Sequence, residues 1–146
     1  MSFGIQPVDV GWWWAQVAVT WCLVGLIWVV QIVIYPLMAR MDVTGFSSWH
    51  RVYTQRIGWV VAPMMVLEAA LAGWWLFHTP GNGWAWVGGG LLVLVWASTF
   101  ALQIPLHRRL AQGWDRPVIE RLVATNWVRT VAWSLRGLLF LGLIAT

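Results

Sequence analysis

The sequence predicts an all-α integral membrane protein, a four-helix bundle with very little chain outside the membrane. The 146-residue chain is 60% hydrophobic and only 10% charged, which is far from the composition of a soluble domain. Its apolar residues fall into four stretches, each near or above the roughly 20 residues that cross a bilayer core. The predicted spans of this single domain, 1–146, are roughly 11–38, 58–77, 84–106 and 123–145.

Polar segments join these spans. Residues 39–56 form the first connection, in which Ser47 is the predicted N-cap of a helix that continues into the second span. The second connection, 78–83, is a tight turn rich in Pro and Gly, and Gly113 and Pro117 interrupt the third. We therefore expect the connections to lack regular secondary structure, except where the first connection leads into the helix of the second span.

The arginines predict the orientation of the bundle. They flank the first and third connections, whereas the second connection and both ends of the chain have none. The positive-inside rule then places the first and third connections in the cytoplasm and both termini outside, in a multi-pass protein of the inner (plasma) membrane. No basic residue or cleavage site accompanies the first span, so we expect it to remain as an anchor. The flanking residues are Arg40, Arg51, Arg56, Arg108, Arg109, Arg116 and Arg121.

Charge and cysteine content exclude several classes of function. The net charge of +4 is small and lies on short connections, so it indicates topology and not a nucleic-acid partner. Cys22 is the only cysteine, which excludes a disulfide within the chain and a thiolate cluster. The sequence has no Gly-rich phosphate loop. Membrane lipid is the partner that composition predicts.

Aromatic residues have two expected roles. Most of the fifteen tryptophans lie near the ends of the predicted spans, as in the aromatic belts of membrane proteins. Trp14, Trp21, Trp28 and Tyr35 repeat every seven residues along the first span. This stripe indicates either packing and lipid contact or the lining of a ligand cavity.

Ionisable and polar residues inside the spans are the candidates for function, because they are costly in a bilayer unless paired or facing water. Glu68 lies near the middle of the second span, and His50 lies eighteen residues before it. These two share a helix face only if Pro63 does not kink the helix between them. His107 and His50 are the candidate acid and base groups, together with Glu68.

The fourth span carries a polar face, since Asn126, Arg129, Trp133 and Arg136 are spaced three, four and three residues apart. Other spans bring further polar side chains to the same half of the bundle. We therefore predict a polar pocket that opens toward the cytoplasmic half. Its remaining candidate ligand-binding residues are Gln31, Tyr35, Tyr53 and Gln103.

Two interpretations of this polar interior remain open. In one, Glu68 pairs with Arg129 or Arg136 and the amides bond across helices, so that the polar residues serve only to hold the bundle. In the other, the surplus positive charge binds a phenolate, a quinone oxygen or a haem propionate. Paired ligation of haem by His50 and His107 is an alternative, as is a metal site that adds Glu68, although no motif supports a metal.

The last third of the chain resembles the anthrone oxygenase-like family of four-span membrane proteins. The resemblance rests on Gln103-Ile-Pro-Leu-His-Arg-Arg-Leu110 and on Arg121-Leu-Val-Ala-Thr-Asn-Trp-Val-Arg-Thr130, with Tyr35-Pro36 closing the first span. Some members of this family convert an anthrone to an anthraquinone without a cofactor. The resemblance implies a four-span fold and roles for Pro36, Asn126, Arg129 and Thr130, with Gln103 and His107 as weaker matches. His107-Arg108-Arg109 stands where the family has an asparagine-rich turn.

The sequence thus predicts a membrane protein that binds a small aromatic, quinone-like or lipid ligand in an intramembrane pocket. The resemblance implies one form of this function, a cofactor-independent oxygenase, in which His107 or His50 would remove a proton and Arg129 with Asn126 would stabilise a phenolate. The alternative is a non-catalytic accessory subunit, or a haem- or quinone-binding subunit, of a larger membrane complex. The partners expected besides lipid are a second copy of the chain or such a complex. A transporter is less well supported, because the two halves lack evident inverted repeats.

Overall fold

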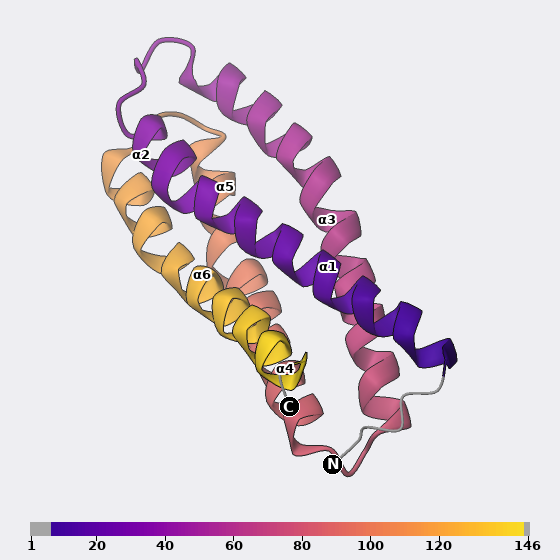
Figure 1. The fold of residues 1–146 in the computed structure, drawn as a ribbon. Helices are drawn as coiled ribbons and strands as arrows, with labels where there is room; N and C mark the ends of the chain where they lie inside the picture. The colour runs from indigo at the N-terminus through magenta and orange to yellow at the C-terminus, as the bar shows by residue number, and fades with distance from the viewer. Residues whose placement is uncertain (1–6, 145–146) are drawn as a thin grey trace.

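Four long antiparallel helices form the bundle in the computed structural model, which describes residues 7–144 and the side chains from residue 10 onward (Figure 1). All four are long and apolar enough to cross a membrane, which confirms the predicted fold class. The first and third are each interrupted by a π-helical segment, η1 and η2. The elements are α1 Pro7–Val29, η1 Val30–Ile34, α2 Tyr35–Met38, α3 Phe46–His78, α4 Gly83–Ser98, η2 Thr99–Gln103, α5 Ile104–Leu110 and α6 Arg116–Ile144.

The two π-helical segments share one cause. Each ends two residues before a proline, Pro36 after η1 and Pro105 after η2. Proline cannot donate to the carbonyl four residues earlier and its ring crowds that carbonyl, so the chain takes up one extra residue per turn just ahead of it. Pro63, by contrast, lies inside the unbroken helix α3. The helix from His50 to Glu68 is thus continuous, which meets the condition set by Pro63, and the irregular turns lie before Pro36 and Pro105.

The helices extend further than the hydropathy pattern predicts, so the connections are shorter. Helix α3 begins at Phe46, and its N-cap is Gly45 in the left-handed region with φ of 88°, not Ser47 as predicted. Gly45 is suited to this position because it lacks a Cβ. In the tight turn, Asn82 caps α4 by accepting hydrogen bonds from the backbone N–H groups of Trp84 and Ala85.

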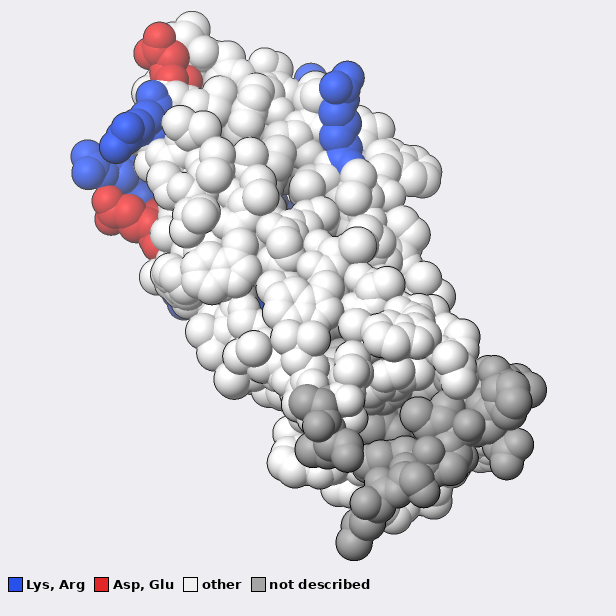
Figure 2. Space-filling view, in the orientation of Figure 1, with Lys and Arg blue, Asp and Glu red and all other residues white. Residues whose placement is uncertain are grey.

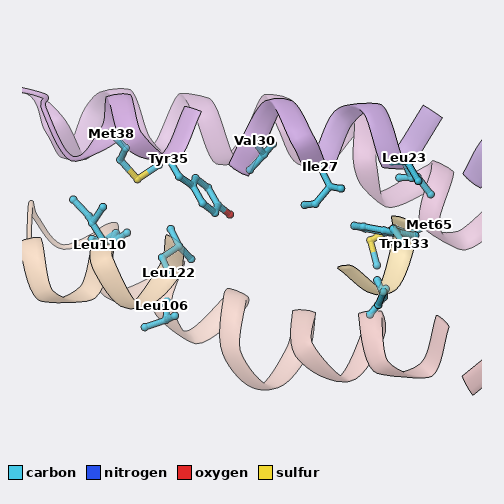
Figure 3. Packing of buried hydrophobic residues seen from close by; sticks show 14 of the residues in the cluster. Leu23, Ile27, Val30, Tyr35, Met38, Met65, Leu106, Leu110, Leu122 and Trp133 are labelled. Carbon is cyan, nitrogen blue, oxygen red and sulfur yellow. The ribbon is translucent and has the colours of Figure 1, made fainter. Parts of the chain in front are cut away.

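Helix α6 lies against both α1 and α4, while α3 packs against α1 and α4 but only touches α5. Small residues allow the close approaches. A Cβ on Gly137 of α6 would lie 3.2 Å from the Trp21 ring of α1, and one on Gly89 of α4 would lie 3.0 Å from Leu76 of α3. The hydrophobic core follows this seam from Leu23 in α1 to Met65, Leu106 and Leu122 on the other helices (Figure 3).

Among the described residues, exposed arginines and acids gather at one end of the bundle. In the view of Figure 2 the arginines and acids gather at the end that holds the first and third connections, and the rest of that face carries almost none. We call this the arginine-flanked end. Large apolar side chains such as Trp59, Val93 and Leu138 are exposed along the sides, as expected of surfaces that face lipid and not water.

Candidate functional site

A cavity of about 360 Å³ lies in the half of the bundle nearest the arginine-flanked end. Both π-helical segments contribute to its wall, through Val30 and through Thr99 and Gln103. Since π-turns change which side chains face inward, these breaks help to set the lining of the cavity. Its other lining residues come from α1, α2, α3, α5 and α6: Leu26, Ile27, Tyr35, His50, Tyr53, Thr54, Ile57, Gly58, Val61, Ile104, His107, Arg108, Arg129 and Trp133, with Ala111 beyond α5.

A chain of hydrogen bonds runs along the wall of this cavity. Nε2 of His50 lies 3.0 Å from Nδ1 of His107, and Nε2 of His107 lies 3.2 Å from the Tyr35 hydroxyl. The hydroxyl is also 3.5 Å from Oε1 of Gln103. Figure 3 shows the Tyr35 ring pointing from the first transmembrane helix into the bundle. Three helices therefore supply one continuous path of exchangeable protons.

The environment of His50 favours one direction for this chain. Nδ1 of His50 is buried and has no hydrogen-bond partner in the described chain. A buried acceptor without a partner is tolerated better than a buried N–H without one, so Nδ1 is assigned as the acceptor and Nε2 as the donor to His107. His107 then donates from Nε2 to the Tyr35 oxygen, and Tyr35 donates to Gln103.

Arg129 lies beside this chain without a carboxylate. It is 8% exposed, and within the described residues no acidic side chain forms a salt bridge with it. Its Nη2 donates to the Tyr35 hydroxyl and to Oε1 of Gln103, each at 3.4 Å. No acceptor among the described residues takes a hydrogen bond from its Nη1. A buried cation with a spare donor thus lines the cavity.

Amide side chains behind the wall hold Arg129 in place. Asn126 accepts hydrogen bonds from both Nε, at 2.9 Å, and Nη2 of Arg129. Its own amide donates to Oε1 of Gln31 at 2.7 Å, and Gln31 donates to the carbonyl of Val123. Because Gln31 belongs to η1, the first π-helical segment orients the arginine indirectly. Thr130 also donates to Oε1 of Gln31.

Glu68 belongs to a second, separate network deeper in the bundle. Its Oε1 accepts from Nε of Arg136 at 3.1 Å and from the Thr20 hydroxyl at 2.6 Å. Its Oε2 accepts from Nε1 of Trp133 at 2.9 Å. Arg136 also donates to the carbonyl of Gly88, so this network joins all four long helices. Of its members only Trp133 lines the cavity.

The predicted site residues therefore divide into three groups. Seven line the cavity, namely His50, His107, Tyr35, Tyr53, Gln103, Arg129 and Trp133. Gln31 and Asn126 lie behind its wall and orient Arg129. Glu68 and Arg136 pair with each other and do not line it. Of the two partners that the sequence left open for Glu68, the structure selects Arg136.

Aromatic rings fill much of the space around the histidines. Tyr53 stacks on Trp49, with ring centroids 5.2 Å apart and planes 2° apart, and Phe46 stacks on His50. Along the heptad stripe, Trp14 and Trp28 are exposed whereas Tyr35 is buried. Only Tyr35 of that stripe lines the cavity. The tryptophans of the stripe take the packing and lipid-contact role, and the π-turn of η1 separates Tyr35 from them.

Sequence reasoning missed three polar residues that complete these networks. Gln16 and Thr20 lie one turn apart in α1 and reach Glu68 through the Thr20 hydroxyl. Thr125 accepts a hydrogen bond from Gln103 at 3.0 Å. The spacing of four residues between Gln16 and Thr20, within an otherwise apolar helix, is the pattern that identifies such an inward face.

The donor set does not favour a metal or a haem between the histidines. In the described part of the chain, no three His, Cys, Asp or Glu side chains come together as a metal-binding group. The rings of His50 and His107 have centroids 5.2 Å apart and bond directly through nitrogen, which leaves no room for a porphyrin between them.

Comparison with protein family models, curated proteins and solved structures finds no match to this chain.

Proposed function

We propose that the cavity binds a planar aromatic ligand with carbonyl or phenolic oxygens, such as a quinone or a hydroxylated polycyclic ketone. The observation that carries this proposal is Arg129, a buried cation that faces the cavity and forms no ion pair with any acidic side chain in the described part of the chain. An ionisable group inside a membrane is costly, so it indicates function unless another charge compensates it. A ligand oxygen would supply the acceptor that Nη1 lacks.

The size and lining of the cavity support a small aromatic ligand. Its volume of about 360 Å³ is at the lower end of the range for small-molecule sites, which is about 300–1,000 Å³. Trp133, Tyr53 and Ile27 offer apolar faces, while Arg129, His107 and Tyr35 offer hydrogen bonds on one side. This combination suits one ring system whose oxygens lie along one edge.

The hydrogen-bond chain supports acid and base chemistry on such a ligand as the catalytic form of the proposal. In the oxygenase that the family resemblance implies, the hydrogen bond from His50 to Nδ1 of His107 opens, this Nδ1 takes a proton from a ring CH₂ group, and Arg129 stabilises the resulting phenolate. The carbanion then gives electrons to O₂, a C–O bond forms, and loss of water leaves a ketone. The reaction converts CH₂ and O₂ to C=O and H₂O and uses no other oxidant.

Binding is tested first, with the purified protein in lipid nanodiscs and 2-hydroxy-1,4-naphthoquinone as the probe. Arg129→Gln should weaken binding by about tenfold or more, because a charge-assisted hydrogen bond is lost. Arg121→Gln is the matched control, since Arg121 is an exposed arginine of the same helix. Equal affinity of both variants and the wild type would refute the proposal.

Turnover distinguishes an enzyme from an accessory subunit. Oxygen uptake and anthraquinone formation are measured together with a hydroxylated anthrone as substrate. An oxygenase consumes one O₂ for each ketone formed, and Arg129→Gln abolishes this activity. Tight binding without turnover supports the non-catalytic role instead. A quinone that co-purifies with the wild type, seen in its absorbance spectrum, would support that role directly.

A further inference from the structure

Two helix faces border the cavity and remain partly accessible. On α3 the lining residues are Thr54, Ile57, Gly58 and Val61, and beside them α5 and the residue after it provide Ile104, His107, Arg108 and Ala111. Both sets follow the spacing i, i+3, i+4, i+7, which is the seam that two packed helices normally bury. None of the eight residues is fully buried. The seam between α3 and α5 is therefore not closed.

The packing of α3 explains why this seam stays open. Near the tight turn, α3 is held close to α4, where Leu76 fits against Gly89. Toward the arginine-flanked end α3 only touches α5. The residues that face the gap are small at several points, and a Cβ on Gly58 would meet no atom within 4 Å.

The opening changes in polarity along its length. Thr54, Arg108 and Ala111 lie toward the arginine-flanked end, and Val61 and Ile104 lie further into the apolar spans. At that depth a gap between two helices opens onto lipid and not onto water. Its inner end reaches His107 of the hydrogen-bond chain. The cavity thus has a polar wall inside and an apolar side opening.

We infer that the slot between α3 and α5 is a lateral entrance through which a membrane-dissolved ligand enters, with its ring in the cavity and an aliphatic tail in the bilayer. This inference rests on the proposed function and names its ligand class, a lipid-tailed aromatic. A volume of about 360 Å³ holds a ring system but no long chain, so a tail must leave through the opening. Gly58 is the position at which a tail passes α3.

Photolabelling tests this entrance. Two probes are used in phosphatidylcholine nanodiscs, an azido-1,4-naphthoquinone with a dodecyl tail and the same compound without a tail. The wild type should be labelled by both, on peptides that contain residues 54–61 and 104–111. Gly58→Trp should lower labelling by the tailed probe at least tenfold more than labelling by the tail-free probe, because a bound tail has to stay in the slot that the indole occupies, whereas a ring without a tail only passes through it.

Gly73→Trp is the matched control, because Gly73 is an exposed residue of the same helix, a Cβ there also meets nothing within 4 Å, and it does not line the cavity. It should label as the wild type does. Wild-type labelling of Gly58→Trp by the tailed probe, or equal loss of both probes, overturns the lateral entrance. If neither probe labels the wild-type cavity, the lateral entrance and the proposed function both fail. If the proposed function is correct, Arg129→Gln loses labelling by both probes.

Discussion

Glu68 of α3 and Arg136 of α6 form an ion pair of 3.1 Å in which both side chains are 0% exposed. Three further groups bond to the pair: the Thr20 hydroxyl, the Trp133 indole and the carbonyl of Gly88. Nη2 of Arg136 is buried and has no hydrogen-bond partner among the described residues. A buried pair is favourable only when such additional hydrogen bonds offset the cost of desolvation. The pair therefore ties α3, the helix that stands apart near the cavity, to the rest of the bundle.

Removal of one partner from this pair should destabilise the bundle strongly. Glu68→Leu leaves Arg136 buried without its counter-charge, at an expected cost of about 3–5 kcal/mol in the free energy of unfolding. Replacing both residues, as Glu68→Leu with Arg136→Met, should recover most of that loss because no unpaired charge remains. Unfolding in mixed micelles measures the free energy of unfolding of the single and the double variant. A double variant no more stable than the single one would contradict this account.

Gly88 is required by the same network. A Cβ at this position would lie 3.0 Å from Nη1 of Arg136 and 3.4 Å from the Trp75 ring. Gly88→Ala should therefore lower the free energy of unfolding by about 1–3 kcal/mol through overpacking. Gly90→Ala is the control, since a Cβ there meets nothing within 4 Å. It should be neutral or stabilising by up to about 1 kcal/mol, as alanine favours the helix.

The fold and the choice of inward-facing residues could be predicted from sequence because both follow from local chemistry. Hydropathy identifies the four spans, and the cost of burying charge in lipid identifies Glu68, Arg129 and Arg136 as functional or paired. The same cost also predicts an ion pair. It does not say which arginine is used, since that depends on the relative depth and rotation of α3 and α6, which the sequence does not fix.

Distances between helices are the part that sequence could not supply. His50 and His107 lie 57 residues apart, and only the packing of α3 beside α5 brings them within hydrogen-bond distance. The π-turns before Pro36 and Pro105 could not be predicted from sequence either. A proline predicts a disturbed helix, but it does not predict whether the helix kinks, breaks or, as here, takes up an extra residue. The positions of Tyr35 and Gln103 depend on that outcome.

Tyr35→Phe should reduce stability and ligand binding together. It removes the hydroxyl that accepts from Arg129 and bonds to His107, leaving buried polar groups short of a partner. The expected cost is about 1–3 kcal/mol. Tyr53→Phe is the matched control, because Tyr53 also lines the cavity but its hydroxyl has no hydrogen-bond partner in the described chain. Its stability should stay within about 0.5 kcal/mol of the wild type. Equal losses in the two variants would mean that the chain through Tyr35 contributes nothing.

The orientation predicted from the arginines is tested by cysteine accessibility in whole cells. The starting protein carries Cys22→Ser, which removes the only native thiol. Gly81→Cys places a thiol in the exposed tight turn, where a Cβ meets no other atom, and Gln112→Cys places one in the exposed connection at the arginine-flanked end. If the positive-inside rule holds for this chain, a membrane-impermeant maleimide labels Gly81→Cys in intact cells and Gln112→Cys only after permeabilisation. The reverse pattern would place the arginine-flanked end outside, and the hydrogen-bond chain of the cavity would then lie nearest the outer face of the membrane.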